Sequence, residues 1–280
     1  MSFQFSDAHI SDYHTLGYTI FRGILPPSLI GDLRRSTDKA REVARQKHGA
    51  QAQRLQPLAD YDVDLKPFHD YAALPPLKDA IARVLTPAHK HGTIEAHPTK
   101  VTYGLGVLLE PADMPWCTRW HRDWRDNIPG LELAKWDAVY RNTNFFNQVN
   151  CALYEDSSTW AVPGSHLRRD LPSEVRRFPD RPIPAPKAEG NTSEEKEQWC
   201  LEYCRSMPGA VRIYLDAGDF MLYRNTLWHL GSYIPYRKRA TLHEAVLTPE
   251  YLAWADRLLE ESNRRKEAGI EYENPNPAGA

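Results

Sequence analysis

Residues 118–126 read TRWHRDWRD, and this stretch decides how the middle of the chain is interpreted. His121 and Asp123 stand two positions apart, so their side chains share one face if the stretch forms a β-strand. Two imidazoles and one carboxylate are a ligand set that holds one face of an octahedral Fe(II) ion. The pair therefore predicts a metal site that needs one more histidine from a distant strand.

His229 is the predicted third ligand. It follows DFMLYR (residues 219–224), a run of strand-forming residues that begins at the turn-forming residues 217–219. His243 is the alternative because it lies in a later strand-like run, although most histidines on strands are only packed or hydrogen-bonded. His166 ends a PGSH turn and is expected to be structural.

Five pieces of sequence give the chain a resemblance to a known family. They are the His-x-Asp pair at 121–123, the AVPGSH turn (residues 161–166), the AGDFMLY strand (residues 217–223), His229, and Arg239 ten positions later. In this order they resemble the phytanoyl-CoA dioxygenase family of Fe(II)/2-oxoglutarate oxygenases, over roughly residues 100–247. The segment SDYHTLGYTIFRGILPPSLIGDLR (residues 11–34) also resembles the opening of this family.

The resemblance implies a mainly β fold with flanking helices and a double-stranded β-helix core of the jelly-roll or cupin-like type. We expect one domain over residues 1–280, with bracing helices and a strand in 1–99, the core in 100–247, and a C-terminal helix and tail in 248–280. The polar, proline-rich residues 168–207 are expected to be a lid insertion. A solvated excursion is the alternative.

Periodicity predicts individual elements as well. Helices are expected after Pro26 and Pro75 and over residues 249–267, and a strand over residues 18–21. The strands expected in the core are VTYGLGVLL (101–109), CTRWHRDW (117–124), NQVNCALY (147–154), VRIYL (211–215), DFMLYR (219–224) and RATLHEAVL (239–247). Short strands separated by turns are typical of a β-sandwich or barrel.

The resemblance further implies 2-oxoglutarate as the cosubstrate on Fe(II), O2 in the remaining position, and stimulation by ascorbate. Arg239 is expected to bind the far carboxylate of 2-oxoglutarate, because a planar guanidinium donates two parallel hydrogen bonds. Arg237 shares its strand face and is the rival. Thr241 and Ser232 are expected to add hydroxyl groups to the same site.

The strand-like NQVNCALY alternates an apolar face with an amide face. The resemblance places this strand beside the metal, so Gln148 and Asn150 are expected to contact the cosubstrate; exposure to solvent is the alternative. Trp120, Trp124 and Arg122 crowd the metal motif. We expect them to contact an anionic or ring-containing substrate, with core packing as the alternative for the tryptophans.

These expectations describe a dioxygenase that hydroxylates an unactivated carbon of a small organic molecule, a secondary metabolite or acyl derivative, and releases succinate and CO2. Asp123 disfavours halogenation, since related halogenases carry a small residue in its place. Two other classes stay open: a non-catalytic jelly-roll binding or sensor protein, and a metal hydrolase in which the same triad holds zinc. An intact ligand set together with Arg239 argues against the binding protein.

Composition sets wide limits. With 280 residues and 41% hydrophobic content the chain can bury one full core. A net charge of −2 and a pI near 6.6 give no reason to expect nucleic acid. No apolar run approaches the ~20 residues that span a bilayer, and residues 1–10 lack a signal-peptide core, so we expect a cytoplasmic protein with no membrane partner. The oligomeric state is not predicted.

We expect four reduced, structural cysteines: Cys117, Cys151, Cys200 and Cys204.

Overall fold

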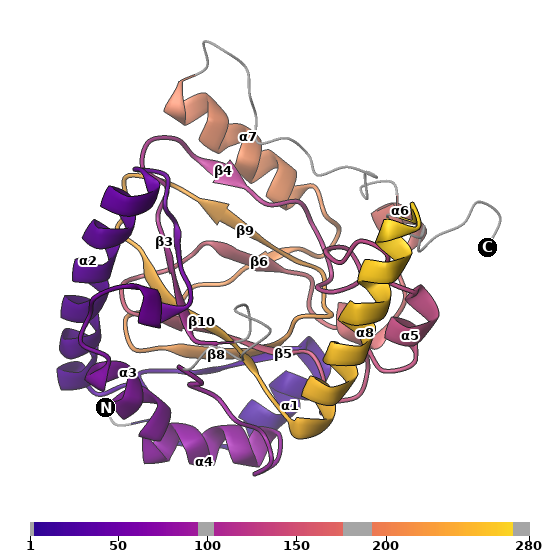
Figure 1. The fold of residues 1–280 in the computed structure, drawn as a ribbon, viewed down its shortest axis with the longest axis horizontal. Coiled ribbons are helices and arrows are strands. Elements are labelled where there is room, and N and C mark those ends of the chain that lie inside the picture. Colours follow the sequence, from indigo (N-terminus) through magenta and orange to yellow (C-terminus); the bar gives the residue numbers. More distant parts are fainter. Residues whose placement is uncertain (1–2, 95–103, 176–191, 271–280) are drawn as a thin grey trace.

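The computed structural model describes residues 3–94, 104–175 and 192–270, which form two antiparallel sheets with helices outside them (Figure 1). The larger sheet has the strand order β1 (Tyr18–Phe21), β8 (Phe220–Arg224), β5 (Asn147–Ala152), β10 (Ala240–Val246), β3 (Gly106–Leu109) and β2 (Arg54–Leu55). The smaller sheet has the order β4 (Trp116–Cys117), β9 (His229–Tyr233), β6 (Thr159–Ala161) and β7 (Val211–Arg212).

The N-terminal helices pack against the larger sheet (Figure 1). They are α1 (Asp7–Leu16), α2 (Pro27–His48), α3 (Lys66–Ala73) and α4 (Pro75–Val84). In α2, apolar residues recur at helical spacing, so Leu29, Leu33 and Ala40 are buried on one face and join Val107 and Leu242 of the sheet in a single core. These helices seal one face of the sheet, so the opposite face of strands β5, β8 and β10 is left to line a cavity.

The remaining helices surround the smaller sheet and its loops. α7 (Ser193–Arg205) contacts β4 and β9, while α5 (Leu133–Asp137) and α8 (Pro249–Glu267) share an aromatic cluster. The short elements are α6 (Pro172–Val175) and two 3-10 turns, Leu58–Asp60 and Ser165–Leu167. No helix among the described residues has both the length and the apolarity to cross a bilayer.

Most of the predicted elements are confirmed. The strand over residues 18–21, the helices that begin at Pro27, Pro75 and Pro249, and the strands β5, β8 and β10 lie where periodicity placed them. The strand predicted over residues 117–124 is wrong in extent, because only Trp116–Cys117 forms a strand and a single bridge joins His121 to His229. The predicted strand at 211–215 is only two residues long. The sequence did not predict helices α1, α3, α5 and α6 individually.

The expected lid, residues 168–207, is only partly described. Residues 176–191 lie outside the described ranges, and its two ends are α6 and α7. The expectation that the cysteines serve packing agrees with their burial: Cys151, Cys200 and Cys204 are buried, and Cys117 packs against Cys204 in the cluster under α7. All four are free thiols.

Candidate active site

The predicted triad is assembled. One ligand atom each from His121, Asp123 and His229 lies within 4.8 Å of the others, and the described residues contain this one such group of His, Cys, Asp or Glu. His121 Nε2 is 3.4 Å from Asp123 Oδ1, and His229 Nε2 is 3.8 Å from Asp123 Oδ2. Both imidazoles therefore present Nε2 to the same small volume beside the carboxylate, as a shared metal ion requires.

Backbone carbonyls orient both histidines. His121 Nδ1 donates to the carbonyl oxygen of Arg119 at 2.8 Å, and His229 Nδ1 donates to that of Leu227 at 3.0 Å. These bonds keep a proton on Nδ1 of each ring, so Nε2 is the atom of each ring that faces the site of a metal. Asn127 Nδ2 donates to Asp123 Oδ1 at 2.6 Å and holds the carboxylate in place.

Asp123 reaches the site from a turn, which corrects the strand argument made from the sequence. His121 exchanges both backbone hydrogen bonds with His229, at 3.1 and 3.0 Å, and the chain then leaves the sheet. The Asp123 N–H donates to Asn225, and Trp124 adopts a left-handed φ of 69°. The left-handed conformation, rare for a tryptophan, stands directly after Asp123, where the chain turns away from the sheet.

The protonation states suit a metal site. Burial lowers the pKa of His229 to about 4, so its imidazole is neutral at neutral pH. Burial opposes the charged form of Asp123, yet the hydrogen bond from His121 and the nearby imidazoles hold its pKa well below the usual range. Burial likewise opposes charge on His121, but Asp123 raises the pKa of that imidazole. An ionised carboxylate beside two imidazoles is a donor set for a divalent cation, which binds by replacing a proton.

The triad opens into a cavity of about 410 Å³ between the two sheets. The larger sheet contributes Gln148, Asn150, Tyr223 and His243, Arg239 stands directly before β10, and the smaller sheet contributes Thr159, His229 and Tyr233. A cavity of this size accommodates a small organic molecule. Since Gln148, Asn150 and Arg239 line it, three of the predicted cosubstrate contacts lie in the same space as the triad.

Arg239 is buried and is held by Asp156, whose Oδ2 accepts its Nε at 2.8 Å. The hydroxyl of Thr241 also donates to Asp156, so Thr241 supports Arg239 from behind and is not among the residues that line the cavity. Ser232 lies at a small neighbouring cavity instead. Arg237 is exposed and borders only that neighbouring cavity among the described pockets, which favours Arg239 for a ligand carboxylate.

A chain of hydrogen bonds orients the amides on the cavity wall. The Tyr223 hydroxyl donates to Gln148 Oε1 at 2.5 Å, and Gln148 Nε2 donates to His243 Nε2 at 3.1 Å. His243 Nδ1 then donates to Asn150 Oδ1 at 2.9 Å, and Asn150 Nδ2 donates to Thr159 Oγ1 at 3.0 Å. Burial lowers the pKa of His243 to about 3, so it stays neutral and keeps this direction. The Thr159 hydroxyl already accepts a bond, so its proton is available to a ligand.

Several cavity residues were missed by sequence reasoning. Arg54 lies on β2 opposite Leu108 of β3, and both residues line the cavity. Thr159 and Asn127 also line the cavity. A two-residue edge strand and two turn-flanking polar residues carry no periodic signal, so the sequence alone offered no way to find them.

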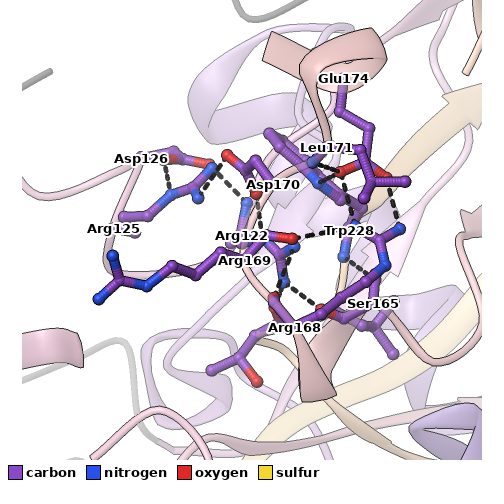
Figure 2. Close-up of polar contacts among 12 residues, drawn as sticks. Arg122, Arg125, Asp126, Ser165, Arg168, Arg169, Asp170, Leu171, Glu174 and Trp228 are labelled. Carbon is purple, nitrogen blue, oxygen red and sulfur yellow. Dashed lines mark hydrogen bonds and ion pairs between the residues drawn. The ribbon is translucent and has the colours of Figure 1, made fainter. Parts of the chain in front are cut away.

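The predicted substrate contacts lie elsewhere. Trp120 is fully buried with Trp228 under α7, and Trp124 packs into the aromatic cluster of α8. Arg122 points away from the cavity and binds Asp170 (Figure 2). Trp120, Arg122 and Trp124, the residues beside the two ligands, are all buried and none of them lines the cavity. For the tryptophans, core packing is therefore the better interpretation.

No protein-family model and no curated protein matches the sequence, but solved structures resemble the fold. AviO1 from Streptomyces viridochromogenes Tue57 superposes with a TM-score of 0.55 at 16% identity, over 87% of this chain and 95% of that chain. The non-heme alpha ketoglutarate-dependent epimerase SnoN and carbocyclase SnoK, both from nogalamycin biosynthesis, give TM-scores of 0.50 and 0.51 at 16% and 15% identity. They cover 86% and 88% of this chain, and 80% and 85% of their own. The chain thus has the fold of non-heme α-ketoglutarate-dependent enzymes.

Proposed function

We propose that this protein is an Fe(II)- and 2-oxoglutarate-dependent oxygenase that hydroxylates an unactivated carbon of a small organic molecule. The observation that carries the proposal is the triad of His121, Asp123 and His229, with both Nε2 atoms beside one carboxylate and Arg239 on the wall of the same cavity. The shared fold with α-ketoglutarate-dependent enzymes supports it. We also infer that the two sheets form a double-stranded β-helix.

The three ligands would hold Fe(II) from one side, as the fixed Nδ1 protons and the ionised Asp123 allow. Bound iron would supply the oxidation of a substrate C–H bond by O2, coupled to conversion of 2-oxoglutarate to succinate and CO2. Arg239 would bind the far carboxylate of the cosubstrate through its Nη groups, because its Nε is committed to Asp156. Thr159 and Asn150 would donate from the adjacent wall.

Asp123 bears on the reaction type. Asp123 would occupy the ligand position that a halide needs on the metal, so hydroxylation is favoured over halogenation. The solved neighbours include an epimerase and a carbocyclase, so stereochemical inversion and ring closure are the competing outcomes. Mass analysis of the product separates them: hydroxylation adds one oxygen, ring closure removes two hydrogens, and epimerisation leaves the mass unchanged.

The first experiment is an anaerobic titration of the protein with Fe(II) and 2-oxoglutarate, followed by visible absorption. We expect the weak charge-transfer band of an iron-bound 2-oxo acid, and we expect His121→Ala and His229→Ala each to abolish both the band and succinate formation. A folded wild-type protein with no band would contradict the proposal. Zinc-supported hydrolysis with no stimulation by 2-oxoglutarate would favour the metal hydrolase. Tight binding of 2-oxoglutarate without turnover would favour the sensor.

A further inference from the structure

The loop that carries His121 and Asp123 is fastened from behind by buried charges (Figure 2). Asp170 accepts Arg122 Nε at 3.0 Å on one oxygen and Arg125 Nη1 at 2.8 Å on the other. The three side chains are 1%, 6% and 2% exposed for Arg122, Arg125 and Asp170. A carboxylate that bridges two buried guanidiniums fixes both of them, because charge-assisted bonds are strong in a dry environment.

Residues 165–174, the segment that includes Asp170, also hold the start of β9, the strand that carries His229. Arg122 Nη1 donates to the carbonyl oxygens of Ser165 and Thr226, at 2.8 and 2.6 Å. The N–H of Trp228 donates to Ser165 Oγ at 2.8 Å, and its indole donates to Glu174 at 3.1 Å. Residues 165–174 therefore contact the neighbours of all three ligands while contacting none of the ligands through these bonds.

The ligand loop needs such support. Beyond the single bridge at His121 it leaves the sheet, and Trp124 holds a left-handed conformation that a regular strand would not impose. Charge matters as well. Arg122 and Arg125 face Asp126 and Asp170, two positive charges against two negative ones. Neutralising Asp170 would leave an uncompensated buried positive charge next to a cation site.

We propose that Asp170 is a positioning residue of the metal site: it locks Arg122, and through Arg122 the His121–Asp123 loop, in the geometry that binds the ion. The proposal rests on the proposed function, because it needs the triad to bind a metal. It assigns a role in metal binding to a residue outside the cavity.

The test measures metal binding alone, with Co(II) as the probe and no cosubstrate. We expect Asp170→Asn to weaken Co(II) binding at least tenfold in competition with a chelator and to change the visible ligand-field spectrum. Asp170→Glu, which keeps the charge, should recover part of the affinity. Once Co(II) or Fe(II) is saturating, the KM for 2-oxoglutarate should stay close to that of the wild type.

Asp219→Asn is the matched control. Asp219 is equally buried, at 3% exposed, and accepts the N–H of Gly23 at 2.7 Å, but it does not line the cavity. We expect it to lower the melting temperature without changing Co(II) affinity. If Asp170→Asn does the same, the proposal is overturned and Asp170 only stabilises the fold.

Arg122→Lys serves if Asp170→Asn does not fold, because lysine keeps the charge but its single nitrogen cannot take the separate positions of Nε, which binds Asp170, and Nη1, which binds the two carbonyls. The same loss of Co(II) affinity is expected, and wild-type affinity would overturn the proposal. A wild-type protein that binds no Co(II) would instead remove the proposed function, and this inference with it.

Discussion

Arg239 is held on two sides before any ligand arrives. Its Nε donates to Asp156, and its backbone N–H donates to Glu110 Oε2 at 2.8 Å. Tyr233 lies under the guanidinium, with 5.1 Å between Arg239 Cζ and the ring centroid. A guanidinium fixed in this way loses little freedom when it binds a carboxylate, so its contribution depends on its planar geometry more than on its charge.

At the scale of this residue we predict that Arg239→Lys raises the KM for 2-oxoglutarate about tenfold or more, since an ammonium cannot replace a bidentate fork. Metal affinity should change little. Arg237→Lys is the control, because Arg237 is exposed and outside the main cavity. Steady-state kinetics of succinate release decide the matter. If Arg237→Lys shows the larger effect, the assignment of the carboxylate contact is wrong.

The triad and its neighbours show which features of the site could be predicted from the sequence. The candidate ligand set followed from residue type and spacing, since few side chains bind Fe(II), and the structure brings its three members together. Contacts made by Arg122 and Thr241 did not follow, because their partners Asp170 and Asp156 lie 48 and 85 positions away in the sequence. Strand parity predicted that Asp123 lies beside His121, and the two side chains do meet, but Asp123 lies in a turn, so the agreement does not come from strand geometry.

Strand β10 shows how one element serves two environments. Arg239 precedes it and His243 lies within it on the cavity face, whereas Leu242 and Glu244 face the helical layer. Glu244 is buried and accepts the hydroxyl of Tyr71 at 2.9 Å.

Long strands such as β10 and β5 could be predicted because their residues alternate between two different faces. β6 and β9 could not, because short strands that are mostly buried show no alternation.

Glu244 gives a prediction about stability and pH. Burial raises its pKa from the ordinary 4.5 to about 7, so the folded state binds a proton that the unfolded state has released. This group's contribution to stability is present below pH 4.5 and is lost as the pH rises toward 7, by about 3 kcal/mol at about 1.4 kcal/mol per pH unit. We expect Glu244→Gln to gain stability relative to the wild type between pH 5 and pH 8.

Denaturant unfolding of both proteins at several pH values measures this difference. His91 lies nearby, and burial lowers its pKa to about 4, so its own contribution has the opposite sign. Glu244 is not among the groups that shift the pKa of His91, so the contribution of His91 is common to both proteins and cancels in the comparison. A constant difference between the two proteins from pH 5 to pH 8 would show that Glu244 does not titrate in this range.

On the scale of the whole molecule, the cavity is an interface between two sheets. His229 belongs to the smaller sheet, while Arg239 precedes β10 of the larger one. A metal ion bound as proposed would engage His121, Asp123 and His229, on the side of the smaller sheet. 2-Oxoglutarate bound to the ion and to Arg239 would join the two sheets.

We therefore predict that Mn(II) alone raises the melting temperature modestly and that 2-oxoglutarate adds a larger increment only when Mn(II) is present. A ligand at about 100 times its Kd stabilises by about 2.7 kcal/mol. Arg239→Lys should reduce the second increment and spare the first, as calorimetry would show. An equal effect of 2-oxoglutarate with and without Mn(II) would mean that it binds away from the triad.

The left-handed Trp124 has a consequence for how the protein matures. Its ring packs against Tyr251 and Trp254 of α8, at centroid distances of 6.0 and 5.2 Å. The turn directly after Asp123 thus packs against side chains more than 120 positions later in the chain. During synthesis, the loop of residues 121–126 is complete in sequence long before these packing partners exist. Under the proposed function, iron would meet the packed form of this loop only after α8 has left the ribosome and docked.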